Sequence, residues 1–304
     1  MTSNIDLTYI TVTKNKLPYF KRGVEKLIAA KKPGEEILIA DGNSTDGTKE
    51  YLAELKRTGQ IDDYISEQDF SESHALNKMF LKAKGEIIKI INDDDAYYYP
   101  VINACKEFMI AHPDIDVMGM EGGSFKHITP NKQEIMQVAG YVENFKKWKE
   151  NHTKWREGGG KPFEFAVLGL MFRRASLPFL GFWDLSFKNA DAEYTFRITA
   201  GPAKLAWCLS PAFVFIRTID GVTWNNLKRM KLEAKRLRKF YLDENPPSTM
   251  RPVVKKFLKD AWKFVTFQKK IRPNEFATPW ETLYAQGAAW LIEKNKDKKV
   301  EFLS

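Results

Sequence analysis

The first ninety residues of the chain alternate between short stretches rich in β-branched and aromatic residues and longer stretches with apolar residues at helical spacing. This alternation is typical of an α/β fold, in which a mostly parallel sheet is covered by helices on both faces. The predicted strands are 7–12, 37–40, 64–65 and 87–91, and the predicted helices between them are 17–31, 44–56 and 74–84.

Beyond residue 115 the alternation becomes less regular. The segment 145–161 is polar and ends in three glycines, which predicts a mobile loop or a short helix. A further helix is expected at 189–199. The remaining predicted strands are 116–121, 133–138, 166–172, 204–209 and 212–217.

Polar clusters follow three of the predicted strands, at residues 13–15, 41–46 and 92–95. Ligands of such sheets bind beyond the carboxyl ends of the strands. We therefore expect the three clusters to converge on one crevice. The chain contains no GxGxxG and no GxxxxGK[ST] pattern, so neither a dinucleotide-binding loop nor a P-loop is supported.

The third cluster holds three adjacent carboxylates, Asp93, Asp94 and Asp95. Neighbouring like charges repel each other and need solvent, a cation or both. Carboxylate oxygens suit Mg²⁺ and Mn²⁺, which proteins hold through one or two carboxylates together with substrate phosphates. The alternative is a solvated acidic turn before the helix that begins near Pro100. The residues alone leave both interpretations open.

Asp41 follows its predicted strand directly and could accept a hydrogen bond from a nucleobase or a ribose hydroxyl. Its structural alternative is capping of the next helix, although Ser44, Thr45 and Asp46 are available for that role. Without a glycine-rich cradle, a divalent metal is the expected means of neutralising a bound diphosphate.

Four ordered segments of the chain resemble family 2 glycosyltransferases, which have the GT-A fold. They are YITVTKN, IADGNSTDGTKEYL, ISEQD followed by HALNKMFLKAKGEII, and INDDDAYYYP. A later segment, LMFRRASLPFLGFWDLSFKNADAEYTFRI, is similar to the second half of the family's pattern, so the resemblance covers roughly residues 6–200. It implies a Rossmann-like sheet and an inverting transferase that uses a nucleotide-diphospho-sugar.

The resemblance also implies the donor site. Asp41 would contact the nucleobase, and Asp93 and Asp95 would stand at the DXD positions, with Asp95 as the main contact of a Mn²⁺ or Mg²⁺ cofactor. The other residues expected around the donor are Thr13, Asn15, Glu67, Lys78 and Asp94.

Asp191 matches the acidic residue that the family uses as general base. An inverting transferase needs such a base to take the proton of the acceptor hydroxyl as it attacks the anomeric carbon. The structural alternative is an N-cap, because an Asp at the start of a helix often has that role.

The chain departs from the family in two places. The His-Gln pair that many relatives carry before the F-F-R-R segment is replaced by Val167 and Leu168. The Q-x-x-R-W motif of processive synthases is missing, and no run of about 18 apolar residues follows. The missing Q-x-x-R-W motif and the missing apolar run favour transfer of a single sugar over polymer extrusion.

Two tryptophans, Trp148 and Trp155, lie in the polar glycine-ended segment. They could belong to an acceptor lid that closes over the donor. Alternatively, they are tucked into a surface loop, and the sequence does not separate these two interpretations.

The net charge of +9 is concentrated at the end of the chain, because residues 224–304 contain 19 Lys and Arg against 9 Asp and Glu. We therefore predict a GT-A domain over 1–223 and a basic helical region over 224–304. Within that region, 224–243 and 251–268 have the pattern of basic amphipathic helices.

The basic region has three interpretations. It could lie on an anionic membrane surface and reach a lipid-linked acceptor, or it could pack as a helical subdomain or dimer interface. Nucleic-acid binding is disfavoured, since no recognition motif is present. The N-terminus lacks the pattern of a secretory signal, so a cytoplasmic protein, peripheral at the inner face of a membrane, is expected.

The favoured function is a metal-dependent inverting glycosyltransferase. It would move one sugar, with a UDP-sugar as the first donor to consider, to a glycan or lipid-linked acceptor in surface polysaccharide or glycan synthesis. One alternative is a sugar nucleotidyltransferase, which usually needs a glycine-rich basic loop after the first strand that this chain lacks. The other is an inactive relative that binds sugar or membrane.

Overall fold

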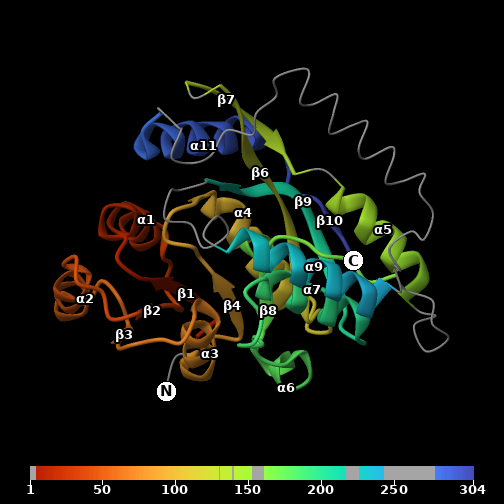
Figure 1. Cartoon of the computed structure of the whole chain (residues 1–304), viewed down its shortest axis with the longest axis horizontal. Helices are drawn as coiled ribbons and strands as arrows, with labels where there is room; N and C mark the ends of the chain where they lie inside the picture. Colours follow the sequence, from red (N-terminus) through yellow and green to blue (C-terminus); the bar gives the residue numbers. More distant parts are fainter. Residues whose placement is uncertain (1–4, 130, 139, 153–160, 217–225, 243–277) are drawn as a thin grey trace.

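The computed structural model describes residues 5–129, 131–138, 140–152, 161–216, 226–242 and 278–304 (Figure 1). A mixed sheet of ten strands runs through the molecule in the order β10-β9-β6-β8-β4-β1-β2-β3, with β5 beside β9 and β7 beside β6. The predicted α/β class and GT-A architecture are confirmed.

The N-terminal half of the sheet is parallel. β1 pairs with β2 and β4, and β2 pairs with β3. This part is built from β1 (Leu7–Thr13), α1 (Leu17–Ala30), β2 (Glu35–Asp41), α2 (Thr48–Arg57), β3 (Asp63–Ser66), α3 (Glu72–Lys82) and β4 (Ile87–Ile90). Each element coincides with a predicted one, apart from small shifts of its ends.

The second half of the sheet is mixed, because β8 runs antiparallel to both β4 and β6 while β6 and β9 are parallel. Its elements up to β8 are β5 (Ala96–Tyr97), α4 (Tyr99–Ala111), β6 (Val117–Thr129), β7 (Lys132–Gln137), α5 (Tyr141–His152) and β8 (Leu170–Arg173). Those that follow are α6 (Leu177–Leu180), α7 (Ala190–Ala200), β9 (Leu205–Phe215), α9 (Leu227–Leu242), α11 (Trp280–Asn295) and β10 (Phe302–Leu303).

One prediction in this half needs correction, and a second is decided between its two alternatives. The strands expected at 204–209 and 212–217 are one strand, β9, whose register against β6 shifts near Pro211. The polar segment from residue 145 is helical up to His152, where α5 ends. This agrees with the short-helix alternative. The sequence left the mobile loop open as well, because α5 buries only a narrow stripe that includes Phe145.

Two apolar cores lie on the two faces of the sheet. Helices α1, α2 and α4 contribute to one core, and α3, α5 and α7 contribute to the other. Strand β1 shows why both form: Leu7 and Tyr9 enter the first core, whereas Ile10 enters the second, since successive side chains of a strand point to opposite faces.

The C-terminal residues join the same sheet and core. Helix α11 lies along β9 and β5 (Figure 1), and the glycine at 287 allows this contact. A Cβ there would already lie 3.3 Å from Ala96 and 3.4 Å from Val214. Strand β10 then pairs antiparallel with β9.

Residues 278–304 are therefore not part of a separate helical unit, in contrast to the predicted division at residue 223. The apolar side chains of α11 pack on strands that lie far away in sequence, and local charge counts do not reveal this. The predicted helix 251–268 lies outside the described residues. The predicted helix 224–243 is present as α9, which packs on α7 through Phe196 and Leu237.

Among the described residues, no helix is long and apolar enough to cross a membrane.

Candidate active site

The acidic loop after β4 lies beside the end of β1, as the sequence predicts. The hydroxyl of Thr13 donates to Oδ2 of Asp93 at 2.7 Å. The ammonium group of Lys16 bridges two carboxylates, at 3.3 Å from Oδ1 of Asp93 and 2.8 Å from Oδ2 of Asp94. Two of the polar clusters thus form one site, at the carboxyl edge of the parallel half-sheet.

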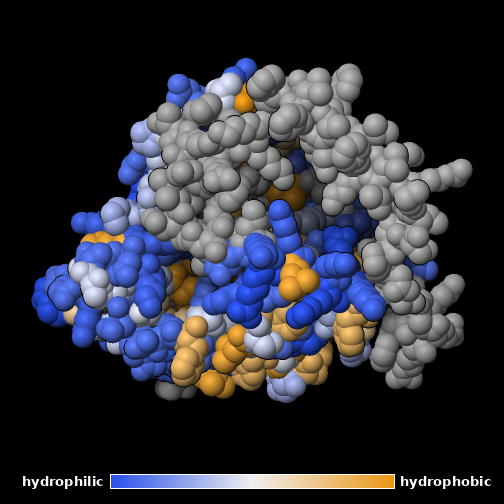
Figure 2. All heavy atoms as spheres, viewed as in Figure 1, coloured by the Kyte–Doolittle hydropathy of each residue, from blue (hydrophilic) through white to orange (hydrophobic). Residues whose placement is uncertain are grey.

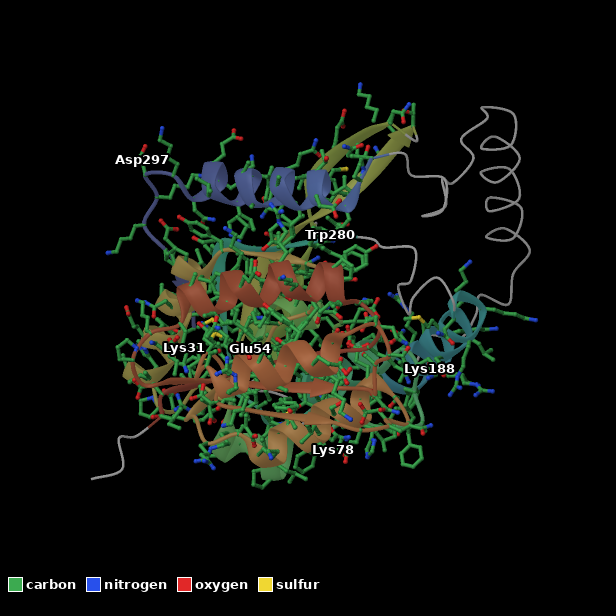
Figure 3. All side chains as sticks on the ribbon, turned by 90° about the vertical axis from the view of Figure 1, so that its left-hand side faces the viewer. Lys31, Glu54, Lys78, Lys188, Trp280 and Asp297 are labelled. Atoms are coloured by element: carbon green, nitrogen blue, oxygen red, sulfur yellow. The ribbon has the colours of Figure 1, made fainter. Side chains whose placement is uncertain are left out.

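Two distant segments hold the same loop from the other side. Oδ1 of Asp95 accepts the backbone N–H of Ile216 at 2.7 Å, and Oδ2 accepts the amide of Asn92 at 3.1 Å. The indole N–H of Trp280 donates to the carbonyl of Asp94 at 2.9 Å. Figure 3 shows Trp280 at the start of α11, above α1. No sequence signal marked Ile216 or Trp280.

Asp41 is completely buried at the end of β2. Its carboxylate accepts the N–H of Ser44 at 3.2 and 3.1 Å and the hydroxyl of Ser66 at 2.7 Å, and the hydroxyl of Ser44 donates to it as well. Ser44 in turn accepts the N–H of Asn15 at 2.8 Å. Oδ1 of Asn15 accepts the N–H of Thr45 at 2.8 Å, so the loops after β1 and β2 are tied together.

Asn15 has a φ of 52°. Asn adopts this left-handed region more readily than most other residues, which explains the residue type at this turn.

Glu67 and Lys78 form an ion pair of 2.7 Å next to this network. Lys78 also pairs with Asp69. The backbone N–H of Glu67 donates to the carbonyl of Asp41 at 3.1 Å, which connects the pair to the expected nucleobase side of the site.

Asp191 stands in the first turn of α7, where Asn189 is the N-cap residue. The N-cap alternative for Asp191 is therefore not what the structure shows. Its side chain reaches solvent, and within the described residues no hydrogen-bond donor engages its carboxylate. Protein atoms nevertheless replace much of the surrounding water, and this burial raises the pKa of Asp191 to about 6.

Glu72 is a candidate that the sequence analysis missed. The side chain of Glu72 reaches solvent, but protein atoms replace much of the surrounding water. This desolvation, reinforced by the charges of Asp191 and Asp94 and opposed by those of Lys16 and Lys188, raises the pKa of Glu72 to about 7. Glu72 is thus within electrostatic range of both Asp191 and Asp94. As an acid in the first turn of α3, after the capping Ser71, it looked like an ordinary helix start.

Lys16 is the second missed residue. Burial alone would lower its pKa, but the charges of Asp93 and Asp94 outweigh burial and raise the pKa of Lys16. Burial raises the pKa of Asp93, and burial followed by the charge of Asp94 raises that of Asp95. The ammonium group therefore supplies the cation that the crowded carboxylates need.

The two tryptophans have different outcomes. Trp148 is buried on α5 against Phe145, and its indole N–H donates to the carbonyl of Thr199 at 2.7 Å. It is a core residue, so the acceptor-lid interpretation is wrong for Trp148 in this structure. Trp155 lies outside the described residues.

The donor atoms of the acidic loop fit a divalent cation. Within the described residues, no three His, Cys, Asp or Glu side chains form a complete metal site. Mg²⁺ and Mn²⁺ bound with a nucleotide need only one or two carboxylates, because the phosphates supply further oxygens. The loop already attracts the Lys16 ammonium, which shows that a cation is favourable there.

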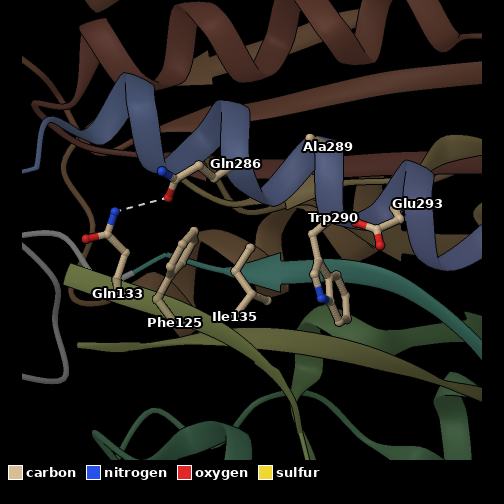
Figure 4. A pocket seen from close by; sticks show the side chains of 7 residues that line it. All are labelled: Phe125, Gln133, Ile135, Gln286, Ala289, Trp290 and Glu293. Carbon is tan, nitrogen blue, oxygen red and sulfur yellow. Dashed lines mark hydrogen bonds between the residues drawn. The ribbon is translucent and has the colours of Figure 1, made fainter. Parts of the chain in front are cut away.

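A shallow pocket lies elsewhere, between α11 and the β6–β7 hairpin (Figure 4). Gln133 donates to Gln286 across it at 3.1 Å. It contains none of the residues described above, so we do not assign the donor to it. Its lining residues are Phe125, Gln133, Ile135, Gln286, Ala289, Trp290 and Glu293.

The acidic loop lies at the carboxyl edge of a parallel half-sheet, in a chain with the GT-A architecture. A family model described as glycosyl transferase family 2 matches residues 8–177, which is more than half of the chain. The chain therefore belongs to glycosyl transferase family 2.

Solved structures share this fold. The mannosyltransferase PcManGT from Pyrobaculum calidifontis, in complex with GDP-Man and Mn²⁺, aligns with a TM-score of 0.53 at 17% identity over 96% of this chain and 88% of its own. S. aureus TarS 1-349 in complex with UDP-GlcNAc aligns with a TM-score of 0.52 at 13% identity, over 95% of this chain and 81% of that one.

In another crystal structure of TarS 1-349, the alignment has a TM-score of 0.50 at 16% identity. It covers 69% of this chain and 60% of the TarS chain. At these identities the similarity concerns the fold. No match is found among curated protein sequences.

Proposed function

We propose that the protein transfers one sugar from a nucleotide-diphospho-sugar to an acceptor hydroxyl, with inversion at the anomeric carbon and Asp191 as general base. The observation that carries this proposal is the pairing of an acidic, cation-binding loop with a nearby carboxylate that no described donor engages. The pKa of Asp191, raised to about 6, leaves this base ionised at neutral pH but still able to accept a proton.

The proposed reaction balances as follows. The acceptor oxygen forms a bond to the anomeric carbon while the bond from that carbon to the diphosphate oxygen breaks. The hydroxyl proton passes to Asp191, and the nucleoside diphosphate leaves with the bonding electrons. Attack from the face opposite to the leaving group inverts the anomeric configuration.

On the donor side, Asp41 is proposed to contact the nucleobase, with Thr13 and Asn15 beside it. The hydrogen bonds from Ser44 and Ser66 hold the Asp41 carboxylate in place, and carboxylate oxygens have further lone pairs for a base or ribose. Glu67 and Lys78 are proposed to form the outer wall of the donor pocket, where their ion pair fixes both side chains.

Asp93 and Asp95 are proposed to hold a Mn²⁺ or Mg²⁺ ion, with Asp94 beside them. When bound, the ion would stabilise the charge that develops on the departing diphosphate. The hydrogen bonds from Thr13, Asn92 and Ile216 fix the direction of the carboxylates before the donor arrives. Such preorganisation lowers the reorganisation needed during the reaction.

A UDP-sugar is the first donor to test, and GDP-sugars follow because PcManGT is in complex with GDP-Man. A glycan or a lipid-linked glycan is the proposed acceptor. A sugar nucleotidyltransferase is disfavoured by family membership and by the loop 14–16, which contains no glycine.

Calorimetric titration of UDP, GDP and dTDP, each with and without Mn²⁺, tests the donor site directly. We expect one diphosphate to bind in a metal-dependent manner and Asp95→Ala to abolish that binding. Lack of binding of all three nucleotides under both conditions would overturn the proposal. If one nucleotide binds, product analysis by NMR with the matching nucleotide-sugar establishes whether the anomeric configuration is inverted.

A further inference from the structure

The outer face of α9 is strongly basic. The helix contains seven Lys and Arg residues and one acid, Glu233. Lys228, Lys235 and Lys239 follow each other at intervals of seven and four residues, so they share one face, and all three are exposed. Within the described residues, no carboxylate pairs with any of these three lysines.

Large apolar side chains are exposed among these charges. Leu232, four residues after Lys228 and on the same face as the lysines, is 51% exposed. Phe240, about a third of a turn around the helix, is 80% exposed. Burying such side chains would be favourable, and nothing among the described residues buries them. A helix with lysines and exposed apolar residues on the same face is typical of the membrane interface, where lysine stems and apolar side chains enter the headgroup region together.

A second group of exposed apolar residues lies below α9. The side chains in this group are each at least 40% exposed. They are Phe179 on α6 and, in the segment that follows, Phe182 and Leu185. The backbone beneath them is fixed, because the guanidinium group of Arg197 donates to the carbonyls of Leu180 at 2.5 Å and Phe182 at 2.8 Å. Their exposure therefore belongs to an ordered surface.

The two groups are joined through the segment before α7. Arg229 donates to the carbonyl of Ser186 at 2.7 Å. Glu233 accepts the backbone N–H groups of Lys188 at 2.9 Å and Asn189 at 2.8 Å. Figure 2 shows apolar side chains along the lower edge of the molecule, below the hydrophilic surface of α9. Figure 3 shows Lys188 beside this helix.

We propose that the outer face of α9, with the exposed apolar residues Phe179, Phe182 and Leu185, forms a docking surface for an anionic lipid bilayer. The lysines supply attraction to acidic headgroups, and the apolar side chains insert between them. A second copy of the chain is a poorer partner, because a two-fold contact through this face would place the same basic helices against each other.

The docking surface is only a few residues from the proposed general base. The segment between Leu185 and Asp191 connects the two, and α9 is hydrogen-bonded to its middle. Docking would bring Asp191 close to the headgroup layer, which selects acceptors that are carried on a lipid. This last step rests on the proposed function, whereas the docking itself does not.

Cosedimentation of the full chain with vesicles tests the docking. The vesicles are pure phosphatidylcholine, or phosphatidylcholine mixed with phosphatidylglycerol as the acidic lipid. The variants are Lys228→Gln/Lys235→Gln/Lys239→Gln and Phe179→Ser/Phe182→Ser/Leu185→Ser. The charge-matched control replaces three exposed lysines elsewhere by glutamine, namely Lys49, Lys298 and Lys299.

We expect the wild-type chain to bind the anionic vesicles and the control variant to bind them equally well. The partition coefficient should fall about 100-fold for the α9 variant and about tenfold for the apolar variant. Nucleoside diphosphate binding, measured by calorimetry on the same samples, should not change in any variant. That result also verifies that the variants are folded, and it separates a failure of docking from a failure of the proposed function.

Three results would overturn the proposal. In the first, the wild-type chain fails to bind anionic vesicles. In the second, the control loses as much affinity as the α9 variant, which would show that the net charge of the protein, and not the α9 face, accounts for vesicle binding. Alternatively, the α9 variant could retain vesicle binding but lose binding to duplex DNA or self-association in sedimentation velocity. The face would then belong to that other partner.

Discussion

The carboxylates of the candidate site fall into two groups that differ in burial and in hydrogen bonding. Asp41, Asp93 and Asp95, at the ends of β2 and β4, are buried and accept hydrogen bonds from neighbouring protein groups. Asp191 and Glu72, at the starts of α7 and α3, reach solvent, and no donor among the described residues engages their carboxylates.

This difference in hydrogen bonding corresponds to two different functions of a carboxylate. A buried carboxylate must be compensated by hydrogen bonds or a cation, and those partners also fix its position. A general base needs a lone pair that no protein donor occupies, and a partly desolvated setting that raises its pKa. The engaged group is therefore suited to organising the donor and its metal, and the unengaged group to proton transfer and acceptor contact.

Substitution of Asp191, the proposed base, should have the largest effect on the reaction. We expect Asp191→Asn to lower kcat by about 10²- to 10⁴-fold, because the amide cannot accept the proton of the acceptor. Donor binding by calorimetry and the melting temperature should stay as in the wild type, since no described hydrogen bond is lost. Asp114→Asn, which changes an exposed Asp far from the site, is the control.

Full activity of Asp191→Asn would remove Asp191 as the base. A large loss of donor affinity or stability in the same variant would instead place Asp191 in the engaged group, and the comparison between the two groups would fail.

Substitution within the engaged group should affect stability as well as binding. Asp95→Ala leaves the N–H of Ile216 without its acceptor, which should lower the free energy of unfolding by about 1–3 kcal/mol. Asp95→Asn keeps an oxygen for that N–H, so it should lose diphosphate binding with a smaller loss of stability. Urea unfolding and calorimetry measure the two effects. Equal stability of the Ala variant and the wild type would contradict this assignment.

Removal of the built-in cation should reveal the charge repulsion within the acidic loop. We expect Lys16→Met to lower the unfolding free energy by about 1–2 kcal/mol without metal, a value below that of a fully buried pair because Lys16 retains some solvent contact. Added Mn²⁺ should recover part of the loss, because it replaces the missing positive charge.

Thermal unfolding with and without Mn²⁺ measures this recovery, and Lys14→Met, at an exposed lysine in the same loop, is the control. A Lys16→Met variant that Mn²⁺ does not stabilise more than the wild type would argue against a cation site at Asp93 and Asp94.

The smallest expected effect is a shift in the pH profile. Asp191 must be deprotonated to act as base, so kcat/KM should rise with pH through about 6 and level off above it. Glu72, whose pKa of about 7 lies above that of Asp191, is mostly protonated where this limb falls, so Glu72→Gln should leave the limb nearly in place. A limb that moves clearly to lower pH in Glu72→Gln would show that Glu72 is ionised in this range and acts on Asp191.

Much of the donor side could be read from the sequence. The strands β1, β2 and β4 have apolar patterns that are local in the chain, and the rule that ligands bind at strand ends brings Thr13, Asp41 and Asp93 together. The assignment of Asp191 as candidate general base came from the resemblance to the family. The structure added that no described donor engages its carboxylate.

The sequence by itself determined the α/β class, the parallel half-sheet and the clusters at its edge, because these depend on periodicities of two and about 3.6 residues within short windows. Only the tertiary structure decided that Ile216 and Trp280 hold the acidic loop, that Trp148 lies in the core and that β10 completes the sheet. Those contacts join segments up to 186 residues apart, and no local pattern specifies which distant surfaces will meet when the apolar faces are buried.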